Sequence, residues 1–110
     1  MILTNNQEIA VLKSIGFIIG ADGKIHPNEI LVLQVFCNSY GLNIDIAMRE
    51  QNQMSANEMR TIISNFSTAD KKLVLSYWKE AMMCDGEAHP NELETVVLMA
   101  MDCVIPLDNE

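Results

Sequence analysis

Basic residues are scarce in this chain of 110 residues, and its C-terminal part has none. The sequence holds 15 acidic and seven basic residues, for a net charge of −8. From Glu80 onward eight acids occur without a Lys or Arg. A nucleic-acid binder needs a basic face, and so does a protein that docks on an anionic membrane. The composition therefore argues against both classes, and it permits a basic protein partner or a cation.

Long hydrophobic runs and paired cysteines are also missing. No apolar stretch approaches the ~20 residues that cross a bilayer, so we expect no direct membrane insertion. The first residues, MILTNNQE, place no basic region before an apolar run, as a secretory signal would. The three cysteines, Cys37, Cys84 and Cys103, form no Cys-x-x-Cys pair. An odd number of such cysteines favours buried thiols in a reducing compartment, and we expect a cytoplasmic protein.

Strand-like alternation is absent, and helical spacing of apolar residues takes its place. Capping residues and prolines mark the helix starts. The expected helices run from about Gln7 to Ala21, from Pro27 to Gly41, through 44–51 after Asn43, behind a Ser55–Glu58 capping box, from about Ser67 to Asp85, and from Pro90 toward Pro106. We therefore predict one all-α domain of about six helices over residues 1–110.

The apolar pattern also predicts which residues form the core. The helix that begins at Pro27 is apolar nearly all round, which favours a central, buried position. The last helix carries an apolar stripe at helical spacing. We interpret the methionines at 82, 83, 99 and 101 as core filler, with an exposed Met-rich groove for a partner helix as the alternative. The residues expected to be mostly buried are Leu31, Val35, Val74, Trp78, Val97 and Met101.

One stretch occurs twice. Residues 21–30 read ADGKIHPNEI and residues 84–93 read CDGEAHPNEL, with six of ten positions identical. Each copy lies between two apolar helices, so each is the elbow of a helical hairpin. The chain thus resembles two pseudo-symmetric hairpins joined by a middle section. Two copies are too few for a solenoid, which needs at least three repeats.

The elbows have four interpretations. The back half of an EF-hand loop fits, but Ile18, Gly20, Ala81 and Met83 stand where its first carboxylates belong. We therefore reject a true EF-hand, while a lower-affinity site that uses Asp, Glu and backbone carbonyls stays open. Carboxylate and imidazole together would suit a divalent cation such as Zn²⁺ or Mn²⁺. A J-domain is disfavoured because both copies read His-Pro-Asn rather than His-Pro-Asp. The fourth interpretation is purely structural.

The structural interpretation needs no ligand. Asp-Gly supplies a turn, Pro opens the next helix, and Glu in its first turn meets free N–H groups. It explains every residue type except the repeated histidine. If a cation binds instead, its ligands are expected to be Asp22, Glu29, Asp85 and Glu92, with His26 and His89 supporting. The sequence shows no nucleophile with a base and no phosphate loop, so we expect no enzyme.

The elbows with their flanking helices resemble the TerB-like family. The similarity covers A-D-G-x-I-x-x-x-E and C-D-G-E-A-x-x-x-E-L, within roughly residues 7–42 and 70–105. The resemblance implies an all-α domain of two related hairpins with an acidic pair at each elbow, Asp22 with Glu29 and Asp85 with Glu92. It also implies suspected metal binding by those acids, protein contacts, and a role in stress response or tellurite resistance.

Overall fold

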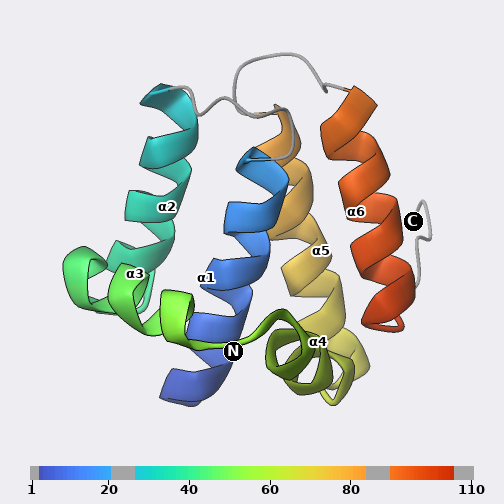
Figure 1. Cartoon of the computed structure of the whole chain (residues 1–110), viewed down its shortest axis with the longest axis horizontal. Helices are drawn as coiled ribbons and strands as arrows, with labels where there is room; N and C mark the ends of the chain where they lie inside the picture. The colour runs from blue at the N-terminus through green and yellow to red at the C-terminus, as the bar shows by residue number, and fades with distance from the viewer. Residues whose placement is uncertain (1–2, 21–26, 84–89, 106–110) are drawn as a thin grey trace.

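The computed structural model describes residues 3–20, 27–83 and 90–105, and all secondary structure within these ranges is helical. The six helices confirm the predicted all-α fold (Figure 1). They are α1 (Asn5–Ile19), α2 (Pro27–Ser39), α3 (Ile44–Gln53), α4 (Ala56–Ser64), α5 (Thr68–Met83) and α6 (Pro90–Asp102).

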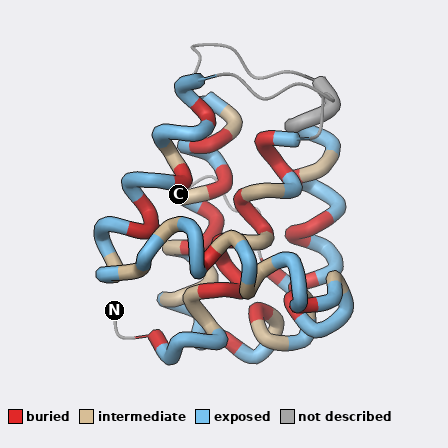
Figure 2. The backbone as a smooth tube through the Cα atoms, turned by 60° about the vertical axis from the view of Figure 1, so that its left-hand side comes forward, coloured by how far each residue is buried: buried red, intermediate tan, exposed pale blue. Residues whose placement is uncertain are grey.

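Helix α1 is the centre of the fold. It contacts each of the other five helices, and it runs between α2 and α5 in Figure 1. Eight of its side chains are buried, on several sides of the helix. The prediction that α2 would be the central helix is therefore wrong. Apolar residues surround α2, but only one side of it packs against neighbours, as the alternating colours of Figure 2 show.

Side-chain caps fix where four helices begin, as predicted from the sequence. Each capping oxygen accepts a hydrogen bond from the backbone N–H three residues later. The distances are 3.2 Å for Thr4, 3.1 Å for Asn43, 3.0 Å for Ser55 and 3.1 Å for Ser67. The other two helices begin at the expected prolines, Pro27 and Pro90.

Gly41 ends the turn that follows α2. Its φ of 69° lies in the left-handed region, which glycine adopts without steric cost. The N–H of Leu42 then donates to the Cys37 carbonyl at 2.8 Å, which satisfies one of the last carbonyls of the helix. This compact ending turns the chain directly into α3.

One buried and one partly buried polar contact join distant parts of the sequence. The Trp78 indole Nε1 donates to the Ser14 Oγ at 2.8 Å, which links α5 to α1. The Tyr40 and Tyr77 hydroxyls lie 3.2 Å apart, and both rings pack against Phe36. These contacts orient α1, α2 and α5 relative to one another.

The predicted core is partly right. Val74 and Trp78 are fully buried, as expected. Leu31, Val35 and Met101 are instead 54, 58 and 68% exposed, and Val97 is 36% exposed, so those four predictions are wrong. The physical reason is position. Helices α2 and α6 lie on opposite sides of the α1–α5 pair (Figure 1), so each buries one face and leaves the other in solvent.

No single helix in the described ranges is long and apolar enough to cross a membrane. Helices α2 and α3 together reach the length and apolar composition of a membrane span, but a bend of 100° separates them.

Candidate functional site

The helix ends that flank the two elbows lie at the same end of the molecule. Helices α1 and α5 end there, and α2 and α6 begin there, in both views (Figures 1 and 2). The elbow residues Asp22, His26, Asp85 and His89 lie outside the described residues, as does the side chain of Glu92. Their predicted role as cation ligands therefore stays a prediction.

Glu29 is the elbow acid whose side chain the structure places. It stands in the first turn of α2, as expected for a carboxylate near free backbone N–H groups. It is only 1% exposed and takes part in an interaction. Glutamate is almost never fully buried unless it is paired. Within the described ranges, no three or more His, Cys, Asp and Glu residues gather as a metal site.

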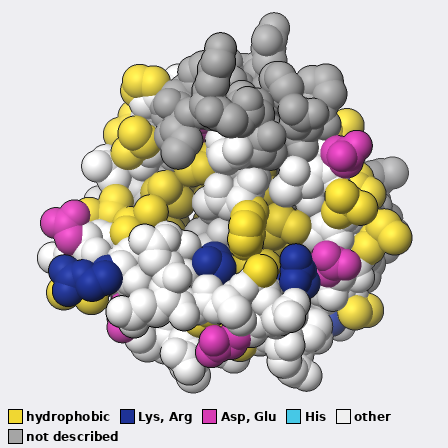
Figure 3. Space-filling view, in the orientation of Figure 1, with side chains coloured by type: hydrophobic (Ala, Val, Ile, Leu, Met, Phe, Trp, Pro, Cys, Tyr) yellow, Lys and Arg dark blue, Asp and Glu magenta, His cyan; other side chains and the backbone are white. Residues whose placement is uncertain are grey.

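Among the described helices, α6 carries the most exposed large apolar side chains, and they lie on its outer face. We define it as Leu93, Glu94, Val97, Leu98 and Met101. Its four apolar side chains are 36 to 68% exposed. At 100° per residue, Leu93, Val97 and Met101 form one row, Leu98 lies beside it, and Glu94 falls between Met101 and Leu98. Figure 3 shows hydrophobic and acidic side chains together over this helix.

Sequence reasoning missed this surface because it assigned the row to the core. Of the four methionines interpreted as core filler, Met99 is buried and Met82 is half-buried, whereas Met83 and Met101 are exposed. A signal was present in the sequence, since Leu98 is apolar but lies outside the row of Leu93, Val97 and Met101. Apolar residues on more than one side of α6 mean that one side packs and another does not.

The basic residues that contact α6 do so at its C-terminal end. Asp102, at its C-terminal edge, forms an ion pair with Arg60 of α4, with Nε and Oδ2 3.3 Å apart. The Lys71 Nζ donates to the Val104 carbonyl just beyond the helix, at 3.1 Å. Both cations thus lie near the C-terminal end of α6. Glu94 is exposed, two turns earlier on the same helix.

Helix α2 has a second exposed apolar surface with different chemistry. Its outer face comprises Ile30, Leu31, Gln34 and Val35, and none of these residues is charged. The apolar members are 44 to 58% exposed. It therefore offers a matched control for α6: comparable exposure, but no charge within the face.

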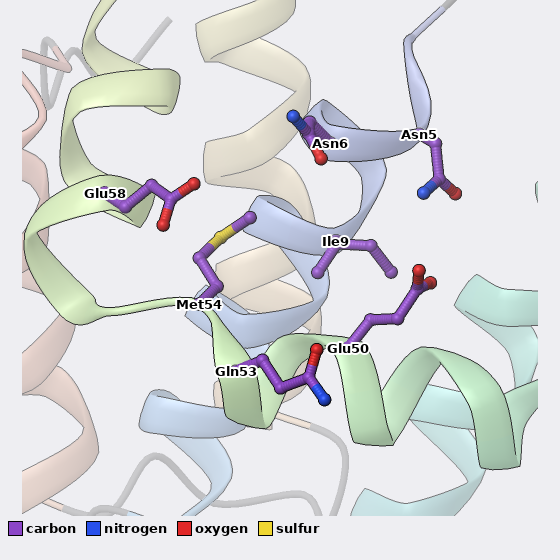
Figure 4. A pocket seen from close by; sticks show the side chains of 7 residues that line it. All are labelled: Asn5, Asn6, Ile9, Glu50, Gln53, Met54 and Glu58. Carbon is purple, nitrogen blue, oxygen red and sulfur yellow. The ribbon is translucent and has the colours of Figure 1, made fainter.

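A surface cleft of about 180 Å³ lies where α1 begins and α3 meets α4 (Figure 4). Its lining combines amides, two carboxylates and two apolar side chains: Asn5, Asn6, Ile9, Glu50, Gln53, Met54 and Glu58. Figure 4 shows Glu50 and Glu58 on opposite sides of Met54 and Ile9. The two carboxylates thus do not converge on a common point, which disfavours a shared cation there.

The described cysteines are poor nucleophiles. Cys37 and Cys103 are buried free thiols. Burial raises the pKa of both, and the pKa of Cys103 rises from 9.0 to about 11, with Asp102 adding to the effect. Because the thiolate is the reactive form, neither residue is activated at neutral pH. Burial and the Tyr77 hydroxyl likewise raise the pKa of Tyr40.

The comparisons with known proteins support the fold and leave the activity open. The chain resembles a crystal structure of a protein of unknown function, PG1108 from Porphyromonas gingivalis W83, with a TM-score of 0.83. The two are 28% identical, and the match covers 98% of this chain and 90% of the other. No family model and no curated protein matches the chain. The TerB-like resemblance therefore still depends on the elbow motifs.

Proposed function

We propose that this chain is a non-enzymatic interaction module of the TerB-like kind, which binds a protein partner through the outer face of α6. The observation that carries the proposal is the exposure of Leu93, Val97, Leu98 and Met101 along one helix. Contiguous apolar patches on a soluble surface mark interaction sites. A link to stress response or tellurite resistance follows from the family resemblance alone.

The partner on this face is a different protein rather than a second copy. Each copy carries a net charge of −8, so two copies repel each other. In a dimer through α6, the basic residues beside the helix would be Arg60 and Lys71, which already contact Asp102 and Val104 of their own chain. A less acidic or basic partner avoids the repulsion between two acidic copies.

The size of the face sets what it can contribute. Burying a large apolar side chain fully gives roughly 1.5–3 kcal/mol, so a half-exposed one gives about 1 kcal/mol. The four apolar side chains together supply about 4 kcal/mol. Micromolar binding requires about 8 kcal/mol after association costs. Further contacts, including those made by Glu94, are therefore needed.

The test is a comparison of two lysine substitutions. Met101→Lys places a charge in the outer face of α6, and Val35→Lys does the same on the outer face of α2. Both positions are more than half exposed, so each change should alter stability by no more than ~0.5 kcal/mol. Proteins captured from the native host by wild type are identified, purified and measured again for direct binding.

The expected result is that the purified partner binds wild type and Val35→Lys but loses affinity for Met101→Lys. A partner that binds Met101→Lys as tightly as wild type would place the interaction elsewhere. Circular dichroism of both variants, with unchanged helix content and melting, serves as the folding control.

The second candidate function is divalent-cation binding at the elbows, and the burial of Glu29 favours it. Glutamate is almost never fully buried unless it is paired, and Glu29 is 1% exposed in the first turn of α2. Ligand carboxylates repel one another in an empty site, so a bound cation would stabilise the fold and Glu29→Gln would remove that gain.

Thermal melting tests this candidate directly. Wild type, Glu29→Gln and Glu92→Gln are melted with chelator and with Mg²⁺, Ca²⁺, Mn²⁺ or Zn²⁺. A cation at 100 times its dissociation constant adds about 2.7 kcal/mol. Glu58→Gln is the matched control, since Glu58 also stands in the first turn of its helix but is exposed. If none of the four ions changes the melting temperature of wild type, this candidate function is wrong.

A further inference from the structure

We infer that the segment recognised by the outer face of α6 is a basic amphipathic helix, with a Lys or Arg that pairs with Glu94. This inference rests on the proposed function and specifies the partner's chemistry. Around the helix, Glu94 lies between the row from Leu93 to Met101 and the direction of Leu98.

Docking over the whole of this face brings a partner next to Glu94. The carboxylate lies one turn before Leu98 and beside the row that begins at Leu93, so a partner that contacts both Leu93 and Leu98 reaches over it. Removing a carboxylate from water without an opposite charge or hydrogen-bond donors is strongly unfavourable. Within the ranges that the structure describes, the cations near α6, Arg60 and Lys71, contact Asp102 and Val104 at its far end. A Lys or Arg of the partner would supply an opposite charge for Glu94.

The shape of the face favours a helix as the occupant. The row from Leu93 to Met101 rises by eight residue steps, or about 12 Å along the axis, which corresponds to about two turns of a facing helix. Side-chain ridges of one helix pack into the grooves of another. The described ranges contain no sheet edge that an extended peptide could join. A partner helix would thus lie on α6 as an additional member of the bundle.

These two requirements define the partner sequence. Apolar anchors at i, i+3 or i+4, and i+7 would contact the row of Leu93, Val97 and Met101. A Lys or Arg at the edge of that stripe would meet Glu94. The acidic character of the chain, with a net charge of −8, would speed the encounter with such a helix at low salt.

The probe is a displayed library of 18-residue helical peptides. Apolar residues occupy the anchor positions, and Lys, Arg, Glu, Gln or Ser varies at the positions beside them. The library is selected on the full chain, and the recovered peptides are measured by fluorescence anisotropy. The protein variants are Glu94→Gln, Met101→Lys and the control Asp45→Asn, which neutralises an exposed acid on α3.

The inference expects Lys or Arg to be enriched beside the anchors, and the best peptides to lose about tenfold or more in affinity for Glu94→Gln. Asp45→Asn should leave affinity within about twofold. Two outcomes overturn the inference but leave the proposed function intact. In the first, the peptides lose affinity for Met101→Lys but are not enriched in Lys or Arg. In the second, they bind Glu94→Gln as tightly as wild type. If no selected peptide is weakened by Met101→Lys, both fail. A chain that sediments as a dimer broken by Met101→Lys also overturns the inference, because a second copy then occupies the face.

Discussion

The hydrogen bond between Trp78 and Ser14 gives a sharp test of how α5 is held against α1. Both residues are 0% exposed, and the donor and acceptor lie 2.8 Å apart. The Ser14 hydroxyl donates in turn to the Val11 carbonyl at 2.6 Å. The change Ser14→Ala removes the acceptor and leaves the indole N–H buried without this partner.

The expected cost follows from three terms. A buried donor left unsatisfied costs roughly 1–3 kcal/mol. Alanine favours a helix over serine by a few tenths of a kcal/mol, which offsets part of that cost. Loss of the hydroxyl bond to the i−3 carbonyl changes little, because such bonds slightly destabilise helices. The net loss should be about 1–2 kcal/mol, which lowers the melting temperature by about 4–8 °C in a domain of this size.

Ser76→Ala is the matched control. Ser76 is an exposed mid-helix serine of α5, and its hydroxyl also donates to the i−3 carbonyl, at 3.1 Å. This variant shares the propensity gain and lacks the buried donor, so its stability should stay within ~0.5 kcal/mol of wild type. Urea unfolding followed by the fluorescence of Trp78, the single tryptophan, measures both variants. Equal stabilities for Ser14→Ala and Ser76→Ala would refute the reasoning.

Further predictions follow from burial and backbone geometry. Cys37 and Cys103 should react with iodoacetamide at pH 8 far more slowly than in urea, because both thiols are buried with raised pKa values. The folded-state pKa of Cys103, about 11, lies above its ordinary value of 9.0, so its contribution to stability is complete below pH 9 and declines toward pH 11 in alkaline melts. Gly41→Ala should cost about 1 kcal/mol in urea unfolding, because φ is 69° there. Val74→Ala should cost about 2 kcal/mol and Val35→Ala less than ~0.5, since the two are 0 and 58% exposed; equal costs would contradict the burial assignment.

Local signals in the sequence predicted the helices well. Asn43, Ser55 and Ser67 cap their helices as expected, and Gly41 follows the end of α2. Each of these features depends on a few neighbouring residues, so a single sequence contains the information. The elbow prolines mark the starts of α2 and α6 for the same reason.

Contacts between distant segments were not predictable in the same way. The partners in the Trp78–Ser14 bond are 64 residues apart, and those in the Tyr40–Tyr77 contact are 37 apart. Periodicity shows which residues share a helix face, but it does not show whether another helix covers that face. The prediction therefore placed α2 at the centre of the fold, whereas the central helix in the structure is α1.

The errors in the predicted core have a physical pattern that bears on function. Leu31, Val35, Val97 and Met101 all belong to α2 or α6, and none is buried by its own chain. Apolar residues at core-like spacing are typical of a helix that packs on two sides. When the second side has no neighbour in the fold, another molecule can supply one. On α6 that side also holds Glu94, which an intramolecular core would exclude, whereas an interface with a basic partner can accommodate it. The misassigned residues of α6 are thus the ones on which the proposed interaction depends.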